Sequence, residues 1–233
     1  MDIAPLRPDE FVATYHGINV PAAPHLGPGM IAAMHQGKYE RQEVQLALAQ
    51  VPRGARILEM GAGSGVVGAV VARHCQPEAM LSVEANPYLL PHIRALYAAN
   101  GLHERVALRH GAVFSDPAAP DQVEFFVRGN FLGSGLARPD HGQVRPVQVP
   151  VIRYAELTEQ HPHDVILMDI EGGELEFLRH AELGPVRLLI AEFHRGIYGR
   201  EGMRECRHLL TAKGMVMDQD ASAAGVHVWR RAA

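Results

Sequence analysis

Short apolar runs alternate with longer segments whose apolar residues recur every three or four positions, from residue 56 to the C-terminus. The short runs predict β-strands, and the longer periodic segments predict amphipathic helices that cover them. Strands that alternate with helices form a largely parallel sheet with helices on both faces. We therefore predict an α/β fold with a Rossmann-like, doubly wound, mostly parallel sheet of seven strands. The expected strands are 56–60, 81–84, 106–110, 165–169, 186–192, 215–217 and 226–229.

Residue types at the ends of the periodic segments predict where the helices begin and end. In the helix after the second strand, Asn86 is expected as the N-cap and Pro87 at the first position, and Gly101 ends the helix. The helix after the fourth strand is expected to start at about Glu171. Further helices are expected over 40–51, 66–74 and 202–212. The buried stripe of the helix after the second strand is expected to be Leu89, Ile93, Leu96 and Tyr97.

Two parts of the chain depart from this alternation. Residues 1–38 show no clear period and contain turn-rich sequence, so we expect an irregular arm that packs on the domain. Between the third and fourth strands, extended segments 123–127 and 147–152 flank the glycine-rich stretch 129–142, and this pattern predicts a hairpin-like insertion. The chain is accordingly divided into an arm and helix, 1–52, and an α/β domain, 53–233.

Composition narrows the class of protein. The chain has 22 Lys and Arg against 26 Asp and Glu, a formal charge of −4, and no run of five like charges, so no nucleic-acid partner is expected. Apolar stretches fall short of the ~18 residues of a membrane span, and the first residues lack the layout of a secretory signal. Cys75 and Cys206 lack metal-like spacing and are expected to be reduced, as in a cytoplasmic protein.

The first strand runs into a loop that contains Gly61, Gly63, Ser64 and Gly65. Glycines let the chain turn sharply and let a ligand approach bare backbone. Glu84 lies at the end of the second strand, where a carboxylate can accept hydrogen bonds from a ribose diol. The same stretch also satisfies the dinucleotide pattern G-x-G-x-x-G, so it predicts an adenosine-type ligand without choosing between NAD and a sulfonium nucleotide.

Glu59 favours the sulfonium nucleotide. A carboxylate two residues before the first glycine would face the pyrophosphate of NAD at close range, which is electrostatically unfavourable. The cationic amino group of a methionine moiety would instead be attracted to Glu59. We therefore expect S-adenosyl-L-methionine as the cofactor, with an NAD-dependent oxidoreductase and a non-catalytic nucleotide-binding homologue as the alternatives.

Five segments resemble the FkbM family of methyltransferases. The sequence Glu59-x-Gly61-x-Gly63-x-Gly65 resembles motif I of class I methyltransferases, and residues 83–87, 110–113, 168–178 and 191–194 are similar to further blocks of the family. The resemblance covers about residues 55–195 and implies O-methylation of a hydroxyl on a small molecule or sugar. The residues expected to bind the cofactor are Glu59, Gly61, Gly63, Ser64, Gly65, Glu84, Ala85, Asn86, Gly111, Ala112 and Asp169.

Methyl transfer to a hydroxyl requires alignment of the acceptor and a base that removes its proton. Asp169, at the end of the fourth strand, is the first candidate for a base or acceptor-orienting group, followed by His194 and Glu171. Each also has a structural interpretation, because Asp169 could cap a helix, Glu171 could match its dipole and His194 could pack. Glu174 is a weaker candidate.

A divalent metal held by Asp169, Glu192 and His194 was weighed, but these residues come from different strand ends and no local spacing supports it, so no metal is expected. Tyr39 and Glu40, at the junction of the arm and the first helix, could lie over the cofactor, although helix entry is the simpler account of Glu40. The residues leave open whether the hydroxylated acceptor is a sugar, a natural product or an RNA ribose, and they leave the oligomeric state open.

Overall fold

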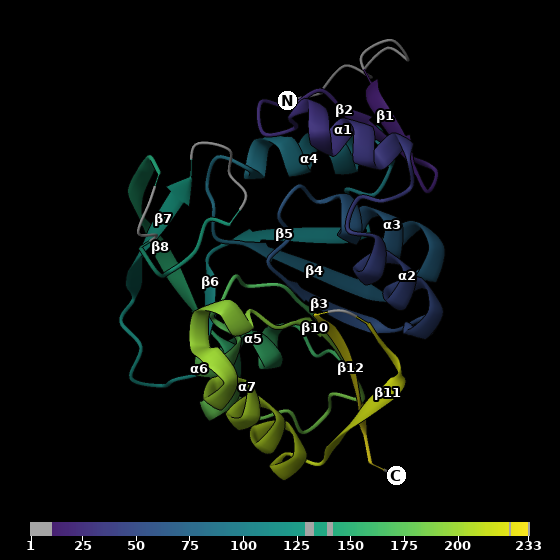
Figure 1. The fold of residues 1–233 in the computed structure, drawn as a ribbon. Helices are drawn as coiled ribbons and strands as arrows, with labels where there is room; N and C mark the ends of the chain where they lie inside the picture. The colour runs from purple at the N-terminus through teal and green to yellow at the C-terminus, as the bar shows by residue number, and fades with distance from the viewer. Residues whose placement is uncertain (1–10, 129–132, 139–141, 224, 233) are drawn as a thin grey trace.

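A seven-stranded sheet forms the centre of the protein (Figure 1). The computed structural model describes residues 11–128, 133–138, 142–223 and 225–232. The strand order is β11-β12-β10-β9-β3-β4-β5, and β12 pairs antiparallel with both of its neighbours while the other pairings are parallel. The strands are β3 (Arg56–Met60), β4 (Ala79–Glu84), β5 (Val106–His110), β9 (Val165–Met168), β10 (Leu188–Glu192), β11 (Met215–Ala223) and β12 (Val226–Arg231). The predicted α/β fold with a mostly parallel seven-stranded sheet is confirmed.

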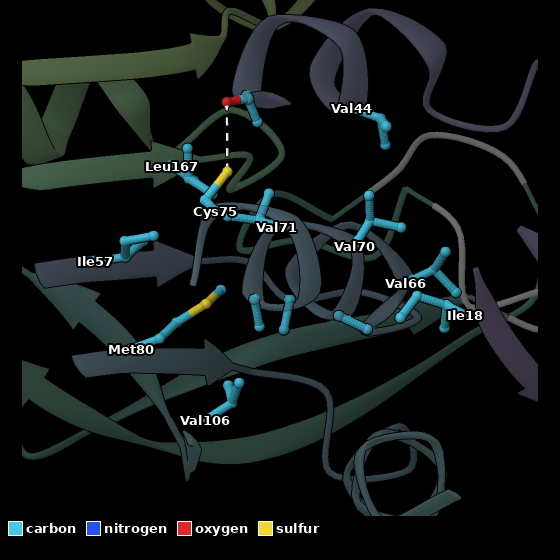
Figure 2. Packing of buried hydrophobic residues seen from close by; sticks show 14 of the residues in the cluster. Ile18, Val44, Ile57, Val66, Val70, Val71, Cys75, Met80, Val106 and Leu167 are labelled. Carbon is cyan, nitrogen blue, oxygen red and sulfur yellow. Dashed lines mark hydrogen bonds between the residues drawn. The ribbon is translucent and has the colours of Figure 1, made fainter. Parts of the chain in front are cut away.

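Helices cover both faces of this sheet because its strands alternate their apolar side chains between two cores. Figure 2 shows Ile57, Met80, Val106 and Leu167, from four different strands, in the same apolar cluster as Val66 and Val70 of α3. The neighbouring strand residues Leu58, Leu81 and Ile166 belong to the other core, together with α5, α6 and α7. The helices are α1 (Pro28–His35), α2 (Arg41–Gln50), α3 (Val66–Cys75), α4 (Leu90–Ala99), α5 (Tyr154–Gln160), α6 (Glu174–His180) and α7 (Arg195–Ala212).

The strand order places a ligand crevice between β3 and β9. From β3 the chain proceeds outward to β4 and β5 on one side, whereas β9 and β10 build the other side. Connections that leave neighbouring strands in opposite directions open a crevice beyond the carboxyl ends of those strands. The glycine loop after β3 and Asp169 after β9 both lie at this point.

Residues 11–38 of the N-terminal arm form regular elements, which corrects the expectation of an irregular arm over this described part of residues 1–38. Strands β1 (Phe11–Tyr15) and β2 (Ile18–Pro21) form an antiparallel hairpin, and α1 follows it. His16 and Gly17 form the turn with positive φ angles of 45° and 75°. Two-residue hairpin turns of this kind usually carry Asn or Asp in the first position, so His16 gives no turn signal in the sequence.

The insertion between β5 and β9 is a small sheet of its own. β7 (Gln122–Arg128) and β8 (Val144–Arg153) pair antiparallel, as the predicted hairpin requires. A third strand, β6 (Ala112–Phe114), pairs parallel with β8 and was not predicted, because three residues are too few to establish a period. Part of the glycine-rich stretch 129–142 lies outside the described residues.

Three predicted helix starts need correction. α4 begins at Leu90, and Asn86 instead accepts a hydrogen bond from the Tyr88 backbone N–H within the preceding turn. α6 begins at Glu174 because Glu171 has a φ of 50°, which is left-handed backbone that no α-helix contains. α7 begins at Arg195, seven residues before the expected start at 202, and contains a kink at Gly199.

Two further expectations concern the cysteines and the membrane. Cys75 and Cys206 are both buried free thiols, as expected. Among the described residues, no helix combines the length and the hydrophobicity that a bilayer crossing requires.

A buried polar network joins the sheet to α4 beneath the glycine loop. Glu59 is 3% exposed and is hydrogen-bonded to Ser82 on the neighbouring strand, whose hydroxyl also lies 3.0 Å from that of Tyr97. Burial raises the pKa of Glu59 to about 8, because the charged form loses its hydration. The folded protein therefore keeps a proton on Glu59 over a range of pH in which the unfolded chain has released it.

We expect the free energy of unfolding to fall as the pH rises from about 5 to about 8, because the folded state binds the extra proton. Glu59→Gln removes this titration, so the variant should gain about 2–4 kcal/mol relative to the wild type across that interval. Urea unfolding at several pH values measures both profiles, with Glu104→Gln at an exposed position as the control. Parallel profiles for Glu59→Gln and the wild type would contradict this account.

Candidate active site

A cavity of about 600 Å³ opens at the carboxyl ends of the central strands. Its volume lies within the range of roughly 300–1,000 Å³ that is typical of small-molecule sites. Nine of the residues predicted to bind the cofactor line it: Gly61, Gly63, Ser64, Glu84, Ala85, Asn86, Gly111, Ala112 and Asp169. The other two, Glu59 and Gly65, do not line this cavity. The predicted residues are thus brought together around one space large enough for a nucleoside.

The glycine loop is held between β4 and β9. The backbone N–H groups of Gly61 and Ala62 both donate to the carbonyl of Val83, at 3.0 Å each. Gly61 has a φ of +86°, and a Cβ there would collide with the carbonyl oxygen of Asp169. Only glycine allows this close approach of the loop to the end of β9. Gly63, by contrast, has no atom within 4 Å of where its Cβ would be, so this part of the loop is open to a ligand.

Gly65 has a packing role. It stands at the N-terminus of α3 with a φ of +78°, and a Cβ there would lie 2.9 Å from Ile93 on α4. Side chains larger than hydrogen would therefore separate the two helices. The third glycine of the motif brings α3 and α4 together, and the first and third glycines consequently serve different neighbours.

Glu84 is positioned by the backbone around it. Its carboxylate accepts hydrogen bonds from the N–H groups of Gly63, at 2.7 Å, and Asn86, at 2.6 Å. Burial raises its pKa to about 7, while these backbone donors favour the charged form. Asn86 is 1% exposed, and its Nδ2 has no hydrogen-bond partner among the described residues. A carboxylate and an unpaired amide donor on one cavity wall match the hydroxyls and ring nitrogens of an adenosine.

Glu59 lies deeper than predicted. It lines a smaller cavity of about 70 Å³ that shares Tyr39, Ser64 and Asp169 with the large cavity. Its carboxylate packs against Gly68 of α3, where a Cβ would collide with it. Contact between Glu59 and the amino group of a cofactor stays a prediction, and the observed contacts give Glu59 the additional task of supporting the loop from below.

The three predicted catalytic residues form a cluster with a buried glutamate. His194 Nδ1 lies 3.0 Å from Glu174 Oε1, and its Nε2 lies 3.3 Å from Glu171 Oε2 and 3.7 Å from Asp169 Oδ1. Asp169 and Glu171 line the large cavity, whereas His194 lies behind them at the start of α7. Glu174 is fully buried and also accepts a hydrogen bond from the Gly172 N–H.

The charges of this cluster follow from burial and from the excess of acid. Burial and the nearby Glu171 together raise the pKa of Asp169 to about 8, although His194 opposes the rise. Burial alone would lower the pKa of His194, but hydrogen bonds with Glu171 and Glu174 outweigh it and raise the pKa to about 11. His194 is therefore a cation at neutral pH, which suits it to hold carboxylates in place and prevents it from accepting a proton.

More carboxylates converge on Asp169 than the sequence analysis identified. Oxygens of Glu43, Asp169 and Glu192 lie within 4.8 Å of one another, as do ligand atoms of Asp169, Glu174 and His194. The trio of Asp169, Glu192 and His194 considered from the sequence is thus divided between two groups. Glu43 belongs to α2, more than a hundred residues from Asp169, and helix periodicity gives no sign that its polar face meets a strand end.

Comparison with known proteins identifies the family. The description "Methyltransferase FkbM domain" matches residues 59–217, which is more than half of the 233 residues. A search of curated proteins finds no match to the chain in sequence.

Solved structures share the fold at low sequence identity. A putative tRNA (m1A22) methyltransferase from Streptococcus pneumoniae, in complex with S-adenosyl-L-methionine, is 17% identical with a TM-score of 0.50, over 82% of this chain and 72% of that one. An uncharacterized protein from Listeria monocytogenes is 13% identical with a TM-score of 0.50, over 81% of this chain and 66% of that one. The sequence match and the fold together place the chain in the FkbM family of S-adenosyl-L-methionine-dependent methyltransferases.

Proposed function

We propose that this methyltransferase O-methylates a hydroxyl group of a small molecule or sugar, with Asp169 as the base. The observation that carries the proposal is the shared wall of the large cavity: Glu84 and the glycine loop line one part, and Asp169 with Glu171 lines another. S-adenosyl-L-methionine supplies an electrophilic methyl group when bound. The protein then has to orient the acceptor hydroxyl toward that methyl group and remove its proton.

The charge of the cavity favours an acceptor without phosphate. Its described lining includes no Lys or Arg, and its six carboxylates belong to Glu40, Glu84, Asp116, Asp169, Glu171 and Glu176. Burial lowers the pKa of His25 to about 4, so this lining residue is neutral at physiological pH. A nucleic acid would bring phosphates to a surface that repels them and releases no counterions. A neutral or cationic small molecule fits this electrostatic environment better.

Asp169 meets the main requirement for a general base. A base is most effective when its pKa lies near the operating pH, and burial brings the pKa of Asp169 to about 8. One of its oxygens, Oδ1, has no hydrogen-bond partner among the described residues. We assign His194 the part of a positioning residue that holds Asp169 and Glu171, because its own proton is retained well above neutral pH. Glu171 would orient the acceptor beside Asp169.

Calorimetry tests the cofactor assignment against the alternative of NAD. S-adenosylhomocysteine should bind with heat, because Glu84, Gly63 and Asn86 present a nucleoside site, and NADH should give no heat. The pyrophosphate of NADH would meet the carboxylates around Gly61, and Asp169 lines the cavity there. Binding of NADH without binding of S-adenosylhomocysteine would reverse the assignment.

Asp169→Asn tests the base. The variant should lower kcat by ~10²–10⁴-fold and leave the affinity for S-adenosylhomocysteine nearly unchanged, because the amide retains the shape but cannot take a proton. Wild-type kcat should rise with pH through about 8, as Asp169 deprotonates, and the variant should lose that rise. Asp220→Asn, at an exposed position of β11, is the matched control. A variant that keeps wild-type kcat would favour a non-catalytic role for Asp169.

A screen with isotopically labelled methyl donor tests the acceptor class. Hydroxylated metabolites, amino sugars, sugar phosphates and bulk tRNA are incubated with the enzyme, and mass spectrometry locates the label. Label is expected on the oxygen of an unphosphorylated small molecule, because the cavity lining lacks cationic side chains among the described residues. Label found in tRNA alone would overturn the small-molecule proposal while leaving the methyltransferase assignment intact.

A further inference from the structure

The N-terminal arm contributes a side chain to the cofactor cavity. In Figure 1 the β1–β2 hairpin lies at one end of the main sheet, where β2 contacts α3 and α4 and α1 packs on β1. At the end of this arm, Tyr39 is 8% exposed and lines both cavities. Its hydroxyl lies 2.8 Å from that of Ser64 in the glycine loop. The family match begins at Glu59, so Tyr39 lies outside the segment that defines the family.

Tyr39 is held firmly in this position. Its backbone carbonyl accepts a hydrogen bond of 2.5 Å from the hydroxyl of Tyr15, which belongs to β1 and is 2% exposed. The next residue, Glu40, has a left-handed φ of 40° and starts α2. Burial, together with the nearby Glu40, raises the pKa of Tyr39 above its usual value. The phenol therefore stays protonated and remains a hydrogen-bond donor at physiological pH.

The pair of hydroxyls leaves one proton free to donate. Tyr39 and Ser64 each carry one O–H group, and one of them donates to the other. Ser64 Oγ additionally accepts from the Val66 N–H at 3.3 Å, which uses no proton of Ser64. Whichever hydroxyl donates within the pair, the proton of the other has no acceptor among the described residues. That proton is available to an anion in the cavity.

An anionic group has few other places in this cavity. The cofactor, which the proposed function requires, carries a carboxylate on its methionine moiety, and six carboxylates already line the space. The Nδ2 group of Asn86 is a further donor, but the Asn86 backbone N–H binds the carboxylate of Glu84, and this neighbouring carboxylate would repel a second one. The hydroxyl of Ser115 donates to the carbonyl of Phe177. The paired hydroxyls of Tyr39 and Ser64 lie next to Gly63 in the chain, where no atom stands within 4 Å of the position of a Cβ.

We propose that the hydroxyls of Tyr39 and Ser64 bind the α-carboxylate of the S-adenosyl-L-methionine methionine moiety. Hydrogen bonds from O–H donors to a carboxylate are short and strong because the acceptor is charged. The arm thereby becomes part of the cofactor site, with Tyr39 bridging it to the glycine loop. This inference rests on the proposed function only in its choice of cofactor.

The test compares two cofactors that differ in one group. Calorimetry measures the Kd of S-adenosyl-L-methionine and of decarboxylated S-adenosylmethionine for the wild type, Tyr39→Phe and Ser64→Ala. Tyr39→Phe keeps the buried ring and removes only the hydroxyl, and should weaken S-adenosyl-L-methionine binding about tenfold or more. The same variant should leave the Kd of the decarboxylated compound unchanged. Tyr154→Phe, a buried tyrosine on α5, is the matched control and should change neither value.

The outcomes separate this inference from the proposed function. Equal weakening of both compounds by Tyr39→Phe would mean that the hydroxyl only supports the loop, and no weakening of either would mean that it has no part in binding; each result overturns the inference. Ser64→Ala repeats the comparison from the other hydroxyl, should Tyr39→Phe fold poorly by circular dichroism. A wild-type protein that binds neither compound would instead remove the cofactor assignment itself.

Discussion

The site depends on an excess of buried and half-buried acid at one edge of the sheet. Carboxylates from α2, β10, the loop after β9 and α6 converge there, and His194 is the cation placed among them in the described part of the chain. Because like charges raise each other's proton affinity, such a cluster stays partly protonated near neutral pH. The same cluster gives Asp169 a pKa suited to proton transfer and makes the cavity attractive to cations. The crowding of carboxylates therefore determines both the pKa of Asp169 and the preference of the cavity for cationic ligands.

Two glycines fix how the cluster meets the cofactor loop. Gly61 allows the loop to touch the carbonyl of Asp169, and Gly65 allows α3 to pack on α4. The first contact sets the distance between the glycine loop and Asp169, the proposed base, whereas the second fixes the helix that follows the loop. The distance at Gly61 cannot be adjusted by a side-chain rotation, because backbone atoms form that contact. Rigid placement of this kind is what alignment of donor and acceptor demands.

The sequence predicts those features whose signals are local or periodic. The seven strands, the buried stripe of α4 and the loop at Gly61 and Gly63 follow from apolar period and residue type. The assembly of Asp169, Glu171 and His194 was predictable because strand ends meet at one edge of a parallel sheet. The start of α6 was not predictable, because Glu171 adopts a left-handed backbone conformation that a glutamate side chain does not indicate in the sequence.

Long-range contacts account for the remaining differences. Glu43 reaches the cluster because α2 packs beside β10, and Tyr39 reaches Ser64 because the arm folds back over α3 and α4. The sequence pattern of α2 and that of the arm give no indication of these long-range contacts. The burial of Glu59 against Gly68 likewise depends on the space that α3 leaves above β3. Sequence reasoning identified Glu59 as important from its charge and position, but the depth at which it sits comes from helix packing.

The small sheet of β6, β8 and β7 lines part of the cavity and stands outside the central sheet. Residues of this insertion, such as Phe114 and Phe125, line the cavity, yet its strands pair with one another and not with the seven-stranded sheet. Mutations at its cavity-facing positions can therefore change the cavity without breaking a hydrogen bond of the central sheet, whereas Ile152 of β8 belongs to the core of that sheet. Related proteins with this fold can therefore vary the insertion, and with it the shape of the cavity, while they keep the glycine loop that follows β3.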